Sequence, residues 1–145
     1  MNDNAQLVRG AYDAFAKGDI PAVLALIDDR CEWLEAEHSP YWPGGALVGP
    51  QAVLQGVFMR LGEDFGGTFA VDVRRIVDCG DTVLGEVRYT GTAAATGKAL
   101  DAQAAHVWDL RDGKVVRWQQ YADTLQMADV MGVSPEVALG AGATG

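Results

Sequence analysis

The spacing of apolar residues changes near residue 69, and this change restricts the fold more than any other feature of the sequence. Before it, apolar residues recur every three or four positions, as in Val53, Val57 and Leu61, which is the spacing of a helix with one buried side. After it, apolar and polar residues alternate through four segments, as in strands with one buried face. The sequence therefore predicts helices from its first half packed against a sheet from its second half.

The first half predicts three helices and one strand. The first helix covers residues 7–15, the second follows Asp19 and has Pro21 in its first turn, and the third begins at Pro50. The segment CEWLEA is expected to form a short strand. Prolines and glycines in residues 37–49 predict a loop, which acts either as a lid over a pocket or as a surface or dimer contact.

The second half predicts an antiparallel meander of four strands followed by a short helix at residues 125–131. The strands are FAVDVRRIV, TVLGEVRYTGT, LDAQAAHVWDL and KVVRWQQYAD, and glycine-containing turns separate them. Helices against a curved, mostly antiparallel sheet make an α+β fold, here a cone-shaped α+β barrel whose sheet wraps around three helices. Residues 1–131 are expected to form this single domain, and residues 132–145 an Ala/Gly-rich tail.

Charge and composition exclude several classes of function. The 145 residues include 11 Lys and Arg against 20 Asp and Glu, so the net charge of −9 argues against binding nucleic acid or anionic membranes. Two histidines and two cysteines are too few for a His/Cys metal site, and we expect neither metal nor cofactor. The polar first ten residues and the lack of a long apolar run predict a cytoplasmic protein without signal peptide or membrane span.

The last hairpin decides which side chains share the buried face, and two turns are possible there. A two-residue turn pairs Arg111 with Lys114, whereas a three-residue loop pairs Leu110 with Lys114. The three-residue loop gathers the more apolar set on one side, so we expect it, with His106 opposite Trp118. The expected concave set is Ala104, His106, Trp108, Leu110, Val116, Trp118, Gln120 and Ala122.

His106 and Gln120 are then polar groups in an apolar wall. One interpretation is a core histidine held by a structural hydrogen bond, with Trp108 and Trp118 as ordinary core residues. The other is a binding pocket, because pockets combine apolar walls with a few convergent polar groups. The residues alone do not separate the two interpretations.

The sequence resembles the nuclear transport factor 2-like superfamily, and within it the SnoaL-like polyketide cyclases and ketosteroid isomerases. The resemblance covers residues 3–131 and lies in the segments YDAFAKGDIPAVLALIDD, VGPQAVLQGVF and HVWDLRDGKVVRWQQYADT. It implies a curved sheet with three packed helices, a deep apolar cone and commonly a homodimer. Because this fold hosts enzymes and binding proteins alike, the chemistry has to be argued from the site.

The resemblance also implies positions for catalytic groups. His106 falls where the cyclases have a pocket histidine and the isomerases a protonated aspartate. Gln120 falls where the cyclases have a basic aspartate, and an amide cannot act as that base. Ala104 replaces the arginine of a related epoxide hydrolase and Ala11 replaces the isomerase tyrosine, so neither reaction is expected by those routes.

A base is therefore sought on the first strand, where Glu32 and Glu35 stand on opposite faces. We favour Glu35, since it lies at the strand end beside the loop that carries His38. The alternative for either glutamate is a solvated edge position, or an ion pair with Arg30 or Arg88. A carboxyl group in an apolar cone would have a raised pKa, which suits proton abstraction.

These observations predict a cofactor-free proton-transfer enzyme, an isomerase, cyclase or dehydratase, acting on a small apolar or polyketide-like carbonyl compound. The alternative is a non-catalytic module for small-ligand binding or dimerisation, which the residues at positions 11 and 120 favour. The expected catalytic residues are His106 and Glu35. The expected substrate-binding residues are Gln120, Trp118, Trp108, Ala104, Phe15, Trp33, His38, Tyr41 and Phe58.

Overall fold

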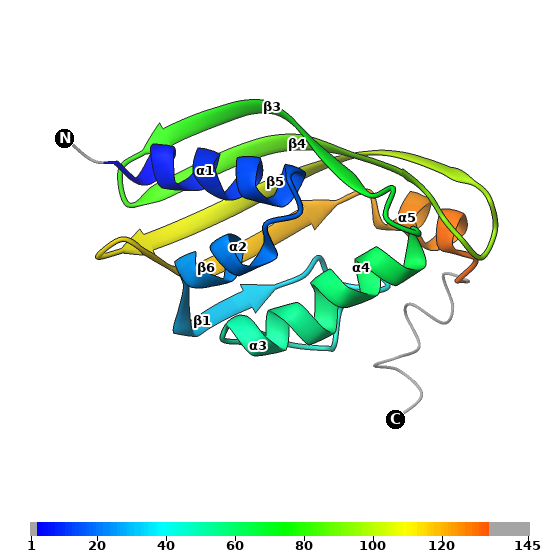
Figure 1. Ribbon diagram of the computed structural model, residues 1–145, viewed down its shortest axis with the longest axis horizontal. Helices are drawn as coiled ribbons and strands as arrows, with labels where there is room; N and C mark the ends of the chain where they lie inside the picture. The colour runs from blue at the N-terminus through cyan, green and yellow to red at the C-terminus, as the bar shows by residue number, and fades with distance from the viewer. Residues whose placement is uncertain (1–2, 134–145) are drawn as a thin grey trace.

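The computed structural model describes residues 3–133, which form one six-stranded sheet with the long helices on one of its faces (Figure 1). The sheet order is β2-β1-β6-β5-β4-β3. All neighbouring strands are antiparallel except β1 and β6, which are parallel. The predicted α+β fold is confirmed, and the curved sheet stays open because β2 and β3 are its two edges.

The helices and strands follow the predicted order with two additions, the short strand β2 and a π turn within the third helix. Their bounds are α1 Asn4–Ala16, α2 Ile20–Leu26, β1 Ile27–Leu34, β2 Leu47–Val48, α3 Pro50–Val53, the π turn Leu54–Phe58, α4 Met59–Asp64, β3 Ala70–Cys79, β4 Thr82–Thr92, β5 Ala99–Arg111, β6 Lys114–Ala122 and α5 Thr124–Met131. Of the expected tail, residues 134–145 lie outside the described residues.

The turn between β5 and β6 differs from the prediction. Arg111 pairs with Lys114, so the turn has two residues, Asp112 and Gly113, and both have positive φ values of 52° and 77°. Positive φ at both central residues is typical of the hairpin turn whose twist matches that of the strands. The expected three-residue loop is therefore wrong, and His106 faces Gln120 instead of Trp118.

A β-bulge in this hairpin restores the predicted grouping of side chains. The register shifts so that Asp109 pairs with Arg117 and Leu110 with Val115, which leaves Val116 as the extra residue. Val115 is buried, and the expectation that Val116 lies on the concave face is wrong. From Arg117 onward, the side chains of β6 point to the same faces as the three-residue loop predicted. His106 and Gln120 therefore still face the helices.

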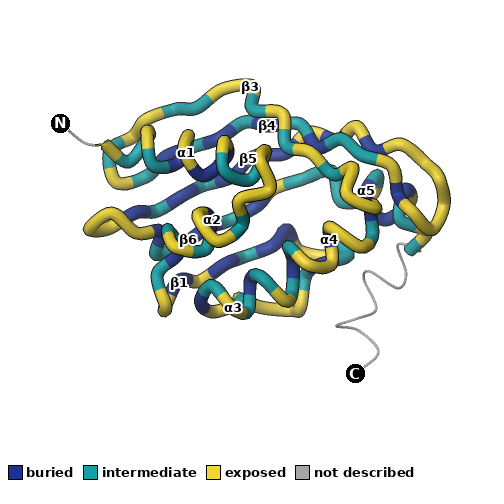
Figure 2. Tube along the Cα trace, in the orientation of Figure 1, coloured by how far each residue is buried: buried dark blue, intermediate teal, exposed yellow. Residues whose placement is uncertain are grey.

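The core lies between the helices and the sheet, where buried segments of both layers face each other (Figure 2). Trp33 of β1 stacks on Trp118 of β6, with ring centroids 3.9 Å apart. This contact joins the two parallel strands at the centre of the core. Cys31 is buried and Cys79 is exposed, and both are free thiols.

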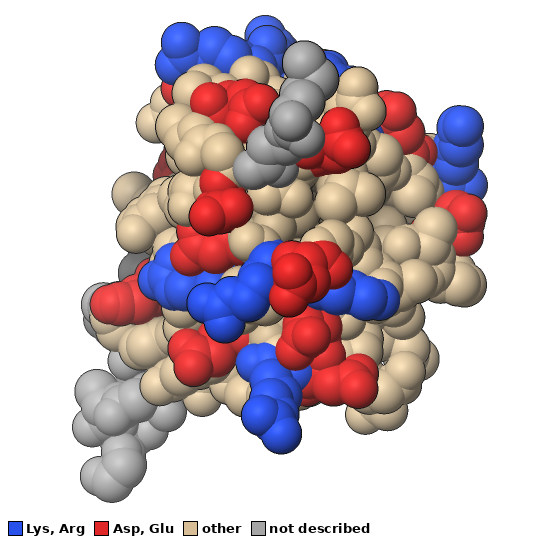
Figure 3. Space-filling view, turned by 90° about the vertical axis from the view of Figure 1, so that its left-hand side faces the viewer, with Lys and Arg blue, Asp and Glu red and all other residues tan. Residues whose placement is uncertain are grey.

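Most charged side chains lie on the surface, where the two signs are interspersed. Figure 3 shows Lys and Arg interspersed with Asp and Glu on one side of the molecule. The ion pairs Arg75–Glu86 and Arg88–Asp101 are exposed, so they add little to stability. In the part of the chain that the structure describes, no helix has the length and apolar character needed to cross a membrane.

Helix α5 lies at one end of the sheet and begins at a capping residue, Asp123 (Figure 1). The Asp123 carboxylate accepts hydrogen bonds from the backbone N–H of Gln126 (3.1 Å) and from its side-chain amide (3.1 Å). Met127, one turn later, is buried in the core. The cap therefore fixes a helix that covers part of the core.

We expect Asp123→Ala to lower the free energy of unfolding by about 1 kcal/mol, because the substitution leaves a helix N–H without its acceptor. Asp123→Asn, whose side chain also caps helices, is the matched control and should keep most of the stability. Urea denaturation followed by circular dichroism measures both. Equal losses in the two variants would contradict the capping role.

Candidate active site

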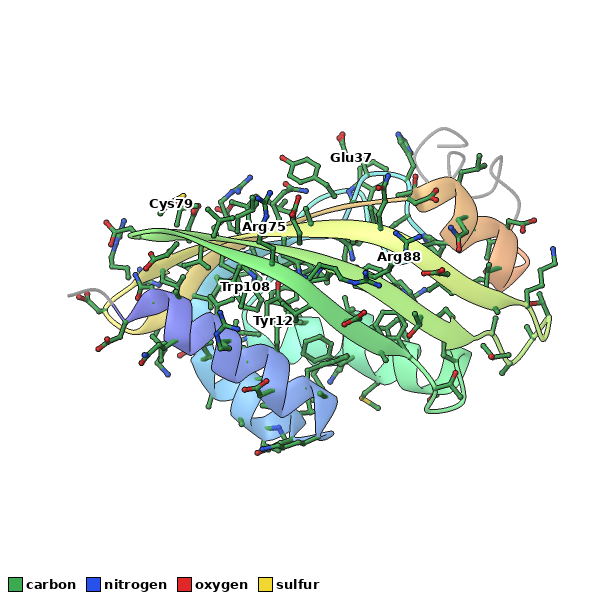
Figure 4. All side chains as sticks on the ribbon, turned by 90° about the horizontal axis from the view of Figure 1, so that it is seen from above. Tyr12, Glu37, Arg75, Cys79, Arg88 and Trp108 are labelled. Atoms are coloured by element: carbon green, nitrogen blue, oxygen red, sulfur yellow. The ribbon has the colours of Figure 1, made fainter. Side chains whose placement is uncertain are left out.

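A cavity of about 60 Å³ lies between the helices and the concave face of the sheet. A space of this kind needs roughly 10–15 Å³ for each water molecule, so it accommodates several waters or part of a small ligand. Figure 4 shows Tyr12 of α1 and Trp108 of β5 between the helix and the sheet. The walls are made by Ala11, Tyr12, Phe15, Val23, Trp33, Glu35, Tyr41, Val57, Phe58, Leu61, Phe69, Val71, Tyr89, His106, Trp108, Trp118, Gln120 and Met127.

A buried hydrogen-bond network is centred on His106. Its Nδ1 lies 2.8 Å from the hydroxyl of Tyr12, and its Nε2 lies 2.5 Å from the hydroxyl of Tyr89. Both ring nitrogens therefore have a tyrosine partner. Its ring lines the cavity, but its nitrogens act on a molecule there only through these two hydroxyl groups.

Two further donors complete the network. The indole N–H of Trp108 donates to the Tyr12 oxygen (3.0 Å), and the side-chain amide of Gln120 donates to the Tyr89 oxygen (2.8 Å). The Gln120 carbonyl oxygen in turn accepts the backbone N–H of Ala36 (3.0 Å), which ties the end of β1 to β6. Strand register makes this possible, because residues 106 and 120 are direct partners across β5 and β6.

Burial keeps the three rings of the network uncharged. It lowers the pKa of His106 from 6.5 to about 3, so the imidazole is neutral at physiological pH. Burial raises the pKa of the Tyr12 and Tyr89 hydroxyls well above 10, and the nearby charge of Glu35 raises the pKa of Tyr89 further. All three groups are thus available as neutral hydrogen-bonding partners.

Glu35 supplies a buried carboxyl group to the same cavity. Only 2% of the residue is exposed, and its Oε2 accepts the indole N–H of Trp33 at 2.8 Å. Burial raises its pKa from 4.5 to about 7, although the Trp33 hydrogen bond and the charge of Arg60 act in the opposite direction. The group therefore changes protonation state near neutral pH, as a general acid or base requires.

Alternation along β1 decides which glutamate faces inward. Counting in twos from the buried Ile27 reaches positions 31, 33 and 35, although the register to β6 shifts between Ile27 and Glu32. After the shift Cys31, Trp33 and Glu35 are buried and Glu32 is exposed. The ion pair considered for Glu35 with Arg88 does not form, since Arg88 pairs with Asp101.

Most of the predicted site residues line this one cavity, and two do not. Ala104 is buried but is not part of the wall, and His38 is exposed with its ring against Trp42, 4.6 Å between centroids. The predicted residues on the wall are Glu35, His106, Gln120, Trp118, Trp108, Phe15, Trp33, Tyr41 and Phe58.

The loop residue Tyr41 contacts two residues of α4. Its hydroxyl donates to Asp64 at 2.8 Å, and the Arg60 guanidinium lies 4.7 Å from its ring centroid. Arg60 also donates to the carbonyl of Pro40 (3.2 Å). These contacts attach the loop to the helix beside the cavity.

A model of the SnoaL-like domain family matches residues 8–118 of the chain. The chain belongs to this family. A crystal structure of an NTF2-like protein from Burkholderia thailandensis E264 is 36% identical, with a TM-score of 0.84, over 90% of this chain and 98% of that protein. No curated protein matches the sequence.

Two further structures share the fold of this SnoaL-like domain. Bal32a, from a soil-derived mobile gene cassette, is 27% identical with a TM-score of 0.80, covering 89% of this chain and 96% of its own. TerC, which was co-crystallised with polyporic acid, is 23% identical with a TM-score of 0.79, covering 90% of this chain and 99% of its own.

Tyr12 and Tyr89 are not among the predicted site residues, although the sequence contains a pattern for each. Tyr12 follows Val8 and Ala11 at helical spacing on the buried side of α1. Tyr89 shares the inward face of β4 with Val83, Gly85 and Val87, which alternate along the strand. Alternation predicts an inward tyrosine at 89, but its meeting with His106 depends on strand pairing.

Gly85 creates the space that the Tyr12 hydroxyl occupies. It pairs with His106 across β4 and β5, and a Cβ atom added there would overlap the Tyr12 hydroxyl and lie 3.0 Å from the ring carbon that bears it. A side chain at 85 would therefore push the tyrosine away from His106.

We expect Gly85→Ala to lower the free energy of unfolding by about 1–3 kcal/mol through overpacking. Thermal denaturation should show a smaller loss when the same substitution is made in Tyr12→Phe, which lacks the overlapping hydroxyl. Gly10→Ala is the control, because Gly10 lies in α1 with open space around it and alanine favours a helix. Equal losses in the two backgrounds would show that Gly85 does not act through Tyr12.

The raised pKa of Glu35 predicts a pH-dependent stability. Because the folded protein holds this proton up to about pH 7 while the unfolded chain releases it near 4.5, stability is lost as pH rises through this interval. Glu35→Gln removes this titration. The free energy of unfolding of the variant, minus that of the unaltered protein, should therefore increase by about 3 kcal/mol between pH 4.5 and 8. Urea denaturation at several pH values measures the difference, and a constant difference would contradict the assignment.

Proposed function

We propose that this SnoaL-like domain is a cofactor-free proton-transfer enzyme that acts on a small apolar carbonyl compound. The observation that carries the proposal is the buried Glu35 carboxyl, with a pKa of about 7, in one cavity with the hydroxyl network around His106. A base at this pKa removes a proton from carbon and returns it at neutral pH. Isomerisation, cyclisation and dehydration all contain such a step.

The chemistry that fits best is proton movement next to a carbonyl group. The Glu35 carboxylate takes a proton from the carbon beside the carbonyl, and negative charge develops on the carbonyl oxygen. A hydroxyl of the buried network stabilises that oxygen by donating a hydrogen bond in a site with little water. Return of the same proton to another carbon of the conjugated system completes a double-bond migration, with no net change in the protein.

The walls favour a neutral ligand with an apolar ring. Among the described wall residues there is no Lys or Arg, so an anionic ligand would have no opposite charge beside it. Phe15, Phe58 and Trp118 present aromatic surface, which suits flat rings. Within residues 3–133 no three His, Cys, Asp or Glu side chains are arranged to hold a metal ion.

A non-catalytic module for ligand binding or dimerisation is the second candidate. The small volume of the cavity favours it, as does Gln120, which cannot serve as a base at the position where the cyclases of the family have an aspartate. This candidate predicts uptake of small ketones without conversion. The homodimer expected from the family stays a proposal that native mass spectrometry tests.

The proposed function is tested with cyclohex-3-en-1-one, a small apolar ketone whose isomerisation to the conjugated enone is followed by ultraviolet absorbance. We expect the protein to accelerate this reaction, with kcat/KM rising with pH and levelling above about pH 7 as Glu35 loses its proton. Glu35→Gln should lower kcat/KM by about 10²–10⁴-fold, because it removes the base.

Glu32→Gln is the matched control, since Glu32 lies in β1 three residues before Glu35 but is exposed. It should keep the activity and the pH profile of the unaltered protein. Equal activity in the two variants would overturn the role of Glu35. Binding of the ketone without isomerisation would support the second candidate instead.

A further inference from the structure

We infer that the hydroxyl of Tyr89 is the group that donates to the carbonyl oxygen of the ligand, and that His106 and Tyr12 position it without donating to the ligand themselves. The inference rests on the proposed function only for the ligand, a small neutral ketone. It assigns three roles within a network whose members all line the cavity.

A backbone group fixes the direction of the hydrogen bonds at one end of the network. The N–H of Ala36 can only donate, so the Gln120 atom that it contacts is the carbonyl oxygen. The other Gln120 atom is then the amide nitrogen, which donates to the Tyr89 oxygen. At the opposite end, the indole N–H of Trp108 can only donate to the Tyr12 oxygen.

Two arrangements of hydrogen atoms satisfy these fixed ends, because a neutral imidazole has one N–H and one acceptor nitrogen. In the first, Tyr12 donates to Nδ1 of His106, and Nε2–H donates to Tyr89. In the second, Nδ1–H donates to Tyr12, and Tyr89 donates to Nε2. Each arrangement leaves one tyrosine O–H without an acceptor in the described part of the chain, on Tyr89 in the first and on Tyr12 in the second.

The position of Glu35 selects the first arrangement. A base and the hydrogen-bond donor must reach neighbouring atoms of one ketone, the α-carbon and the carbonyl oxygen. Tyr89 is joined to the end of β1 through Gln120 and Ala36, the residue next to Glu35, whereas Tyr12 lies on the far side of the imidazole. The negative charge of Glu35 also acts on the Tyr89 hydroxyl.

In this arrangement Tyr89 is a stronger donor than an isolated tyrosine. Its oxygen accepts two hydrogen bonds, from His106 and from Gln120, and donates its own proton. Chains of hydrogen bonds polarise one another, so both incoming bonds strengthen the outgoing one. Tyr12 contributes by occupying Nδ1, which keeps the imidazole proton on the side of Tyr89.

The first experiment compares the binding of cyclohex-2-en-1-one with that of cyclohexene, which lacks the oxygen. The quantity measured is the ratio of the two dissociation constants, which isolates the contribution of the carbonyl. We expect Tyr89→Phe to reduce the preference for the ketone about tenfold, the equivalent of one hydrogen bond. Tyr12→Phe should reduce it by a smaller factor, because it removes the partner that keeps the proton on Nε2 but not the donor itself. Tyr121→Phe, at an exposed tyrosine, should leave it unchanged.

The second experiment reads the tautomer of His106 directly by ¹⁵N nuclear magnetic resonance of the unaltered protein with cyclohex-2-en-1-one bound. We expect a protonated Nε2 and an unprotonated Nδ1. Tyr89→Phe removes the acceptor of the Nε2 proton and should move the proton toward Nδ1. This measurement decides the question even if the Phe variant does not fold.

Three results would overturn the inference. The first is a loss of ketone preference in Tyr12→Phe instead of Tyr89→Phe. The second is a protonated Nδ1 of His106 in the ketone complex. The third is a loss of ketone preference in Trp118→Phe alone. Trp118 is included because its indole N–H is buried without a partner in the described residues. Neither experiment requires Glu35, so failure of the isomerisation test would leave the assignment of Tyr89 standing, and the reverse also holds.

Discussion

A buried imidazole needs a partner at each ring nitrogen, and much of this molecule is arranged to provide them for His106. Leaving either nitrogen unpaired would cost about 1–3 kcal/mol. The partners come from distant parts of the chain, Tyr12 from the first helix and Tyr89 from the fourth strand. Gly85 leaves room for the Tyr12 hydroxyl beside the strand, and Gln120 holds Tyr89 from the other side.

Burial shifts the pKa values of His106 and Glu35 in opposite directions. It removes the charge of the imidazole, because the protonated form is disfavoured away from water, and it retains the proton of the Glu35 carboxyl up to about pH 7. One low-dielectric cavity thus produces a neutral hydrogen-bonding centre and an acid–base group that works near neutral pH. A solvated cleft with the same residues would provide neither property.

The sequence predicted the α+β fold and the order of its main elements because each has a strong periodic pattern. It also predicted that His106, Gln120 and the tryptophans would share a face, although the turn expected between β5 and β6 was wrong. The shorter turn moved the register by one residue and the bulge at Val116 moved it by one more, so the strand partners differ by two residues from the predicted ones while the same side chains share a face. A bulge is a property of strand pairing, and alternation within one strand does not reveal it.

By itself, the sequence determined the helices and the strands, since local periodicity depends only on residue order and type. Tertiary structure alone decided that His38 lies outside the cavity, that Glu35 lies inside it, and that Tyr12 and Tyr89 meet at one imidazole. Residues 12, 89 and 106 come together through the pairing of β4 with β5 and the packing of α1. Contacts between segments this far apart arise only when the chain is folded.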